Sequence, residues 1–102
     1  MFYVYTHWHH DTGYPVCFYV GQSGMSRGKD NRVRAHSTNG RNPMWRNVAK
    51  KHGVDVQIHK DGLTLDEANE IEVELIKRIG RRDLGTGTLT NMDDGGAGSL
   101  GH

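Results

Sequence analysis

The apolar positions near the start of the chain follow a two-residue period. Residues 2–6 and 16–21 are rich in aromatic and β-branched side chains, which favour strands. The polar residues 7–15 between them contain glycine and proline and predict a loop, so the two strands are expected to pair as an antiparallel hairpin. Residues 54–58 alternate in the same way and predict a third strand.

The same period predicts which side chains share a face of the sheet. Phe2 and Val4 lie on one face of the first strand, and Phe18 and Val20 are expected on one face of the second. That face is apolar and suits a hydrophobic core. The opposite face presents the phenol groups of Tyr3, Tyr5 and Tyr19.

Two helix signals lie between the second and third strands. A short basic helix is expected over about residues 31–37, after a loop rich in glycine and serine. A second helix begins at Pro43, because proline suits the first helical position and Asn42 suits the N-cap. It ends at Gly53, since glycine is typical of helix C-termini.

The last helix places one carboxylate among apolar side chains. Thr64 and Glu67 have the spacing of a capping box and predict a helix from about residue 65 to residue 79. On a helical wheel Glu72 lies inside the apolar stripe, one turn after Ala68 and one turn before Ile76. Because a carboxylate facing a core needs compensation, Glu72 is a candidate metal ligand or catalytic acid. The alternative is a structural Glu72 that reaches outward or pairs with an arginine.

The elements together define the expected fold class. Their order is strand, strand, helix, helix, strand, helix, with Asp61-Gly62 expected to turn the chain. We therefore predict an α+β fold, with a small three-stranded, mainly antiparallel sheet flanked by helices. Residues 1–102 are expected to form a single domain, with an irregular, glycine-rich C-terminal tail from about residue 92.

The composition indicates in which cellular compartment the protein is expected. Hydrophobic residues make up 34% of the chain, but no apolar run is long enough for a transmembrane helix and no signal peptide is visible. The lone cysteine, Cys17, excludes an internal disulfide. These features predict a cytoplasmic protein without a membrane partner.

Positive charge is concentrated in the middle of the chain. The segment from Arg27 to Gly53 holds eight of the 13 Lys and Arg residues and only one of the 12 acids, Asp30. Such an excess is typical of a surface that binds a polyanion, although it also fits a solvated helical face. The candidate nucleic-acid-binding residues in this segment are Arg27, Lys29, Arg34, Arg41, Arg46, Lys50 and Lys51.

Several short motifs occur along the chain in the same order as in the GIY-YIG nuclease family, which the chain therefore resembles. The paired triplets and the downstream positions cover about residues 2–96, nearly the whole chain. Each motif alone is weak, and the ordered set is more specific. The matching positions are Tyr3-Val4-Tyr5, Tyr19-Val20-Gly21, Arg32, His36, Glu72 followed by Leu75-Ile76, and Asn91.

The resemblance implies a metal-dependent endonuclease that hydrolyses phosphodiester bonds, with DNA favoured over RNA. Glu72 would hold a divalent ion, Mg²⁺ first and Mn²⁺ second, and Arg32 would stabilise charge on the phosphate. Tyr5 would orient or deprotonate the attacking water. The remaining catalytic assignments, with supporting roles, are Tyr19, His36 and Asn91.

The chain departs from the family pattern in two places. Tyr3 occupies the position of a glycine, and we assign the catalytic role to Tyr5 rather than Tyr3 because Tyr5 holds the third position of its triplet. The connection between the triplets also looks long and carries His7, His9 and His10. Three histidines without a second ligand cluster are poor evidence for a zinc site.

Other functions fit the same residues. The first alternative is a non-catalytic nucleic-acid-binding module on the same fold, and the second is an unrelated small α+β protein with a basic patch. The tyrosines, His36 and Asn91 each have an ordinary structural interpretation as well. Since no separate recognition domain is expected, we predict weak sequence specificity, a preference for nucleic-acid structure or single strands, or a targeting partner. The expected partners also include a second copy of the chain. The sequence does not distinguish repair, homing, restriction or defence.

Overall fold

The computed structural model describes residues 1–24, 33–38 and 41–95. Within these residues the chain has an α+β fold, as the sequence predicts, with no cis peptide bond. The elements in chain order are β1 (Phe2–His9), β2 (Val16–Gly24), α1 (Val33–His36), α2 (Pro43–His52), β3 (Asp55–Leu63), α3 (Leu65–Ile79) and the 3-10 turn η1 (Arg82–Leu84).

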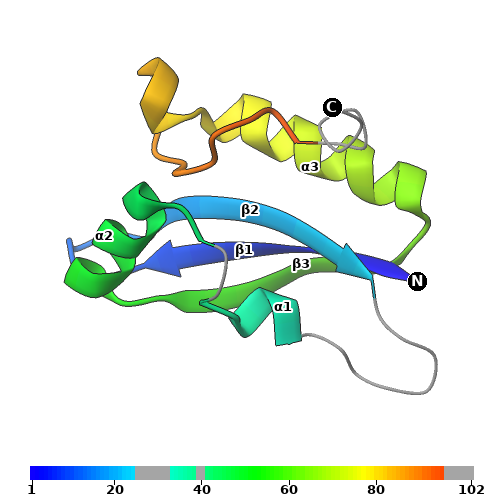
Figure 1. Cartoon of the computed structure of the whole chain (residues 1–102), viewed down its shortest axis with the longest axis horizontal. Coiled ribbons are helices and arrows are strands. Elements are labelled where there is room, and N and C mark those ends of the chain that lie inside the picture. The colour runs from blue at the N-terminus through cyan, green and yellow to red at the C-terminus, as the bar shows by residue number, and fades with distance from the viewer. Residues whose placement is uncertain (25–32, 39–40, 96–102) are drawn as a thin grey trace.

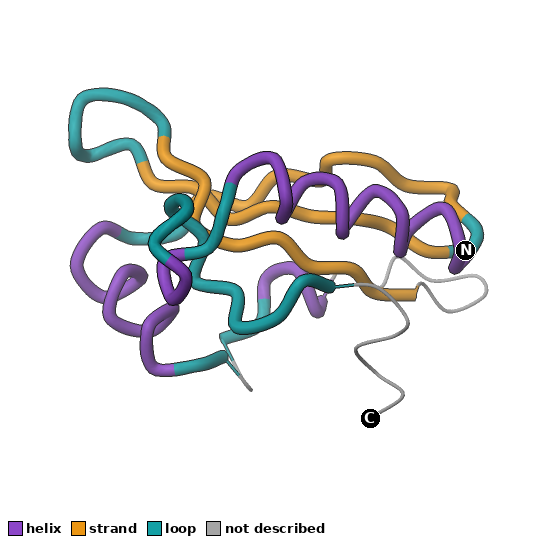
Figure 2. The backbone as a smooth tube through the Cα atoms, turned by 90° about the horizontal axis from the view of Figure 1, so that it is seen from above, coloured by secondary structure: helices purple, strands orange, loops and turns teal. Residues whose placement is uncertain are grey.

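The three strands form one antiparallel sheet in the order β2-β1-β3, so β1 is the central strand. Helix α3 lies over one face of the sheet, and α1 lies on the opposite side (Figure 1). Figure 2 shows α3 running along the length of the strands. Among the described residues, no helix is long and apolar enough to cross a bilayer.

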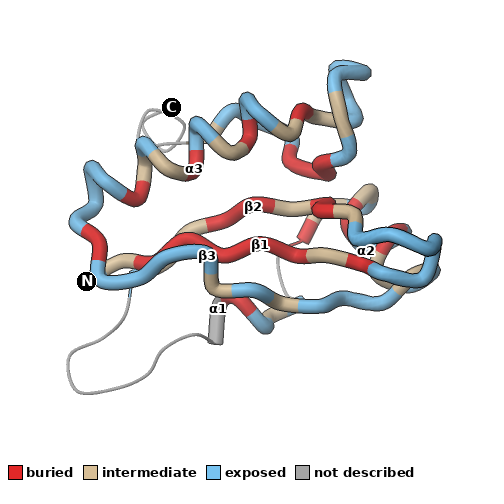
Figure 3. Tube along the Cα trace, turned by 180° about the vertical axis from the view of Figure 1, so that it is seen from behind, coloured by how far each residue is buried: buried red, intermediate tan, exposed pale blue. Residues whose placement is uncertain are grey.

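The largest hydrophobic cluster lies between α3 and the sheet. Val4 and Val20 are fully buried there, and they pack with Ala68 and Ile76 from the apolar stripe of α3. The stripe therefore forms the helix face that the periodicity predicts. Strand β3 is different, because most of its residues are exposed while those of β1 are buried (Figure 3).

Both predicted N-caps are confirmed. The side-chain oxygen of Asn42 accepts a hydrogen bond from the backbone N–H of Trp45 at 2.8 Å. Thr64 and Glu67 form the reciprocal capping box, with bonds of 3.1 and 2.9 Å. Each pair satisfies backbone N–H groups that the first helical turn leaves without partners.

The hairpin is longer than predicted, and its second strand contains a β-bulge. His7 pairs with Tyr19 while the next residue, Trp8, pairs with Cys17, so Phe18 is the extra residue. The predicted placement of Phe18 on the same face as Val20 is wrong for this reason. Phe18 packs instead against Trp45 and Val48 of α2.

Two further predictions about local structure are wrong. Asp61-Gly62 does not end the third strand, which continues to Leu63, because these residues lie at a register irregularity within the pairing of β1 with β3. Gly62 adopts a φ of +66°, which suits a glycine at such a bulge. His7 and His9 were expected in a loop, but both are buried residues of β1.

Candidate functional site

The candidate site is built around the side chain of Tyr5, which lies flat across strand β2. Tyr5 pairs with Gly21 in the sheet, and it is only 1% exposed. A Cβ atom added to Gly21 would lie 2.5 Å from the Tyr5 hydroxyl oxygen, closer than real Cβ contacts occur. Only glycine therefore leaves room for the phenol at this position. The last residue of the Tyr-Val-Gly triplet thus has a steric role.

A buried arginine holds the hydroxyl end of Tyr5. Arg41 donates from Nη1 to Tyr5 Oη at 3.1 Å and from Nε to the carbonyl oxygen of Ser37 at 3.0 Å. Its guanidinium carbon lies 4.8 Å from the ring centroid of Tyr19. Arg41 is only 6% exposed, so it belongs to the surroundings of Tyr5 and not to an exposed basic surface, where the sequence placed it.

More polar and aromatic side chains lie beside Tyr5 on the face of the sheet that α1 covers. His7 lies next to Tyr5, with ring centroids 5.2 Å apart, and it stacks on Tyr19. Trp45 Nε1 donates to His7 Nδ1 at 2.9 Å, and the other ring nitrogen of His7 lies 2.6 Å from the carbonyl oxygen of Ala35. Nδ1 of His7 is therefore the acceptor, and Nε2 carries the proton that is donated to Ala35. These bonds fix the imidazole between α1 and α2.

Glu72 reaches the same strand from the face that α3 covers. It is 9% exposed, and its Oε1 accepts a hydrogen bond of 3.1 Å from Gln22 Nε2. The same amide nitrogen also donates to Asn69 Oδ1. Gln22 immediately follows Gly21 in β2. Glu72 and Tyr5 therefore contact neighbouring residues of the same strand. The predicted inward position of Glu72 is confirmed.

The donor set around Glu72 is rich in oxygen. Gln22 Oε1 is buried and has no hydrogen-bond partner within the described part of the chain. A buried amide oxygen without a partner is costly, and a hard cation would relieve that cost. The side chains available to a Mg²⁺ or Mn²⁺ ion are Glu72, Gln22 and Asn69, and this set fits the metal that the resemblance implies.

Asn91 binds the outer edge of β2. Its Oδ1 accepts from the backbone N–H of Val20 at 3.0 Å, and its Nδ2 donates to the carbonyl oxygen of Val20 at 2.8 Å. One carboxamide thereby satisfies both backbone groups of an edge residue, as a neighbouring strand would. Thr90 extends this contact, because its backbone N–H and hydroxyl both donate to Phe18. Asn91 is thereby held against the backbone of β2, and its supporting role in catalysis stays a prediction.

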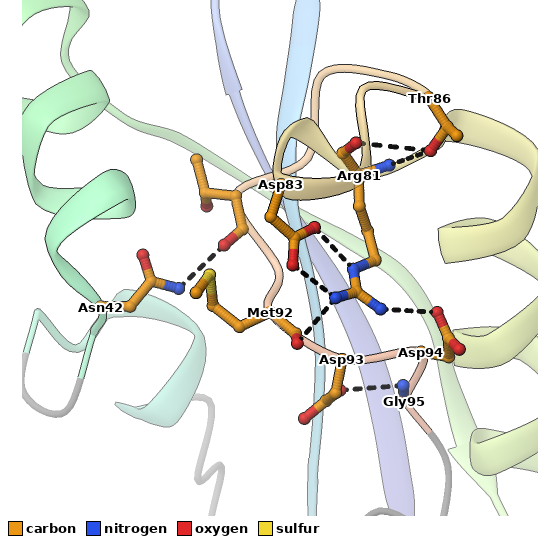
Figure 4. Close-up of polar contacts among 9 residues, drawn as sticks. Asn42, Arg81, Asp83, Thr86, Met92, Asp93, Asp94 and Gly95 are labelled. Carbon is orange, nitrogen blue, oxygen red and sulfur yellow. Dashed lines mark hydrogen bonds and ion pairs between the residues drawn. The ribbon is translucent and has the colours of Figure 1, made fainter.

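The segment that carries Asn91 is anchored at both ends (Figure 4). Asn42 Nδ2 donates to the carbonyl oxygen of Thr90 at 2.8 Å. Arg81 donates to Asp83, to Asp94 at 2.8 Å and to the carbonyl oxygen of Met92 at 2.8 Å. The hydrogen bonds from Arg81 lower the pKa of Asp83 below its ordinary value. This cluster joins the end of α3 to the chain after Asn91.

The remaining predicted residues divide into three groups. Arg27, Lys29 and Arg32 lie outside the described residues, and of Arg34 only its place on α1 is described. His36 ends α1 and is exposed. On α2, Arg46 is exposed and donates to the carbonyl oxygens of Arg41 and Thr38. Lys50 and Lys51 are exposed in the last turn of that helix.

The structure therefore brings three predicted catalytic residues to one stretch of β2. Tyr5 crosses Gly21, Glu72 binds Gln22, and Asn91 binds Val20. The sequence did not indicate the contributions of Arg41, Gln22 and Asn69. The only available signal was that Gln22 follows the Tyr-Val-Gly triplet directly and that Asn69 precedes Glu72 by one helical turn.

Comparison of the chain with protein-family models, with curated proteins and with solved structures found no match.

Proposed function

We propose that the protein is a metal-dependent endonuclease that hydrolyses phosphodiester bonds in nucleic acid, with DNA preferred over RNA. The observation that carries this proposal is that Tyr5, Glu72 and Asn91, from three separate parts of the fold, contact the consecutive β2 residues Gly21, Gln22 and Val20. The sequence resemblance to GIY-YIG nucleases supports the same assignment, because it selects these residues from their order along the chain.

The phenol of Tyr5 has the contacts of a group that positions a nucleophile. Its oxygen accepts a hydrogen bond from Arg41, so the orientation of the phenol is fixed. The phenol oxygen can also accept a hydrogen bond from the attacking water, which it would orient or deprotonate, and its proton can be donated to a phosphate oxygen. A water held in this way needs little reorganisation before it attacks phosphorus.

Glu72 supplies the charge that a divalent ion needs. Its carboxylate, with the amide oxygens of Gln22 and Asn69, would hold Mg²⁺, and the bound ion would supply Lewis-acid stabilisation of a phosphate oxygen. Arg32, which lies outside the described residues, keeps the phosphate-binding role that the resemblance implies. Asn91 would support the geometry of the site by binding the backbone of Val20 at the edge of β2.

The exposed cations of α2 are suited to bind the phosphates of a nucleic acid outside the catalytic site. Arg46, Lys50 and Lys51 are all exposed, whereas Arg41 is buried beside Tyr5. Contacts from Lys and Arg to phosphates give affinity that falls with rising salt concentration. The same cations carry the alternative proposal of a binding module without catalysis, which differs in the outcome of a cleavage assay.

The test is a cleavage assay on single-stranded and duplex DNA and on RNA, with Mg²⁺ or with chelator. Glu72→Gln is compared with Glu70→Gln, which changes an exposed carboxylate two residues away on the same helix. We expect cutting that requires metal, a loss of at least ~100-fold in Glu72→Gln with substrate binding retained, and a wild-type rate for Glu70→Gln.

Two outcomes contradict the proposal. Equal cutting by Glu72→Gln and the wild type would remove Glu72 from the site. Salt-sensitive binding without cutting by the wild type on any substrate would support the binding module instead.

A further inference from the structure

A second group of ligand-type side chains lies at the far end of β1. His9 is the last residue of β1, Asp11 follows two residues later, and His52 is the last residue of α2. His52 Nδ1 lies 2.8 Å from both carboxylate oxygens of Asp11, and His9 Nδ1 lies 3.3 Å from one of them. The two imidazole rings are stacked, with centroids 4.3 Å apart.

One ring nitrogen of His9 is buried without a hydrogen-bond partner among the described residues. The residue is only 4% exposed, and its Nδ1 makes no hydrogen bond of acceptable geometry within the described part of the chain. The 3.3 Å approach to Asp11 is therefore a charge contact without the alignment of a hydrogen bond. A buried ring nitrogen in this state is costly unless another partner binds it.

We propose that His9, Asp11 and His52 form a binding site for a first-row transition metal ion, Zn²⁺ in particular. One ligand atom from each residue lies within 4.8 Å of the others. Bonds of about 2.0–2.2 Å in a tetrahedral site need ligand atoms slightly over 3 Å apart. The 3.3 Å separation of His9 Nδ1 from Asp11 fits this spacing, whereas His52 Nδ1, at 2.8 Å, would move slightly away from the Asp11 carboxylate. A water molecule would complete the four-coordinate site.

The chemistry of this site separates it from Glu72. Two imidazoles and one carboxylate favour Zn²⁺ and its neighbours, whereas amide and carboxylate oxygens favour Mg²⁺. The C-terminus of α2, at His52, also carries partial negative charge that attracts a cation. Bound metal would join the connection between β1 and β2 to α2. The inference does not depend on the proposed nuclease function.

The group was not visible in the sequence because His52 follows His9 by 43 positions. Only the packing of α2 against the hairpin brings His52 to Asp11. The missing second ligand cluster, on which the sequence-based argument against zinc rested, is thus supplied by the fold.

The test is a Zn²⁺ titration of metal-free protein in competition with a chromophoric chelator, repeated with Co²⁺ for its visible absorption. The variants are Asp11→Asn, which keeps the size of the side chain, and His52→Ala. His59→Ala is the matched control, because His59 is an exposed histidine of β3. Thermal unfolding of each variant without metal checks that it folds.

We expect one Zn²⁺ per chain, a tetrahedral Co²⁺ spectrum, and a loss of affinity of at least ~10-fold in both ligand variants. Zn²⁺ should raise the unfolding temperature of the wild type and of His59→Ala, and raise that of Asp11→Asn much less. Glu72→Gln should keep the Zn²⁺ site whether or not it cuts nucleic acid. Binding well below one ion per chain, or binding unchanged in both Asp11→Asn and His52→Ala, would overturn the proposal.

Discussion

The two faces of the sheet are packed with different chemistry. On the α3 side, Val4, Val20 and Ile76 bury aliphatic side chains without directional contacts. On the opposite side, Tyr5 and His7 are equally buried, but each is held by a hydrogen bond to a named partner. Aliphatic burial stabilises the fold, whereas a satisfied polar network also fixes the orientation of each ring. The face that carries Tyr5 and His7 can therefore hold a reactive group in a fixed orientation.

Each face also has a polar feature at β2. Glu72 is the buried acid of the aliphatic face, and Tyr5 sends its hydroxyl group across Gly21 from the aromatic face. The edge strand β2 is therefore contacted by a polar group on each of its two faces. Substitutions on the two faces should have different consequences for stability and activity.

The largest effect on stability is expected from Ile76→Ala on the aliphatic face. Ile76 is 2% exposed, and removing its side chain leaves a cavity that costs about 2–5 kcal/mol in the free energy of unfolding. Urea unfolding measures the change, with Val73→Ala as an exposed control on the same helix. Equal costs for the two substitutions would mean that α3 does not carry the main core.

A smaller loss is expected from Gly21→Ala on the aromatic face. The new methyl group would overlap the Tyr5 ring, and overpacking of this kind costs about 1–3 kcal/mol. Gly24→Ala is the matched control, because its Cβ would lie 3.3 Å from Phe2 at the end of the strand. Denaturant unfolding and the cleavage assay should both distinguish the two variants. An unchanged Gly21→Ala protein would show that the phenol does not lie across β2.

The smallest effect concerns the acid dependence of stability. Hydrogen bonds from Arg81 lower the pKa of Asp83 in the folded protein, so this pair stabilises the fold above the ordinary aspartate pKa of about 3.8. The contribution is lost as the pH falls through the lowered value. Unfolding temperatures between about pH 5 and pH 2 should therefore fall less steeply in Asp83→Asn than in the wild type. The exposed Glu70→Gln serves as the control, and an identical slope in Asp83→Asn would contradict the assignment.

Much of the aliphatic face was predictable, because helical periodicity and capping are local properties. The pattern around Ala68 and Ile76 gave the buried stripe of α3, and it also placed Glu72 inside that stripe. Tyr5 and Asn91 were selected by the order of short motifs, which is a property of the sequence as well. Their convergence at β2 required the fold.

The rest depended on contacts between distant segments. The bulge at Phe18 is set by the pairing of β1 with β2 and has no local signal. Arg41 looked like any other residue of a basic segment until burial placed it at Tyr5. His52 joins His9 and Asp11 only through the packing of α2. Local periodicity carries no information about such pairs.

Comparing Tyr5→Phe with Tyr3→Phe tests whether the phenol of Tyr5 positions the nucleophile. Both tyrosines are buried on the same face of β1, so each substitution removes one buried hydroxyl group. Single-turnover cleavage with Mg²⁺ is the measurement, with substrate affinity and unfolding recorded beside it. We expect the cleavage rate to fall by at least ~100-fold in Tyr5→Phe and to change by only a few-fold in Tyr3→Phe. A Tyr5→Phe protein that cuts at the wild-type rate would show that this phenol does not position the nucleophile.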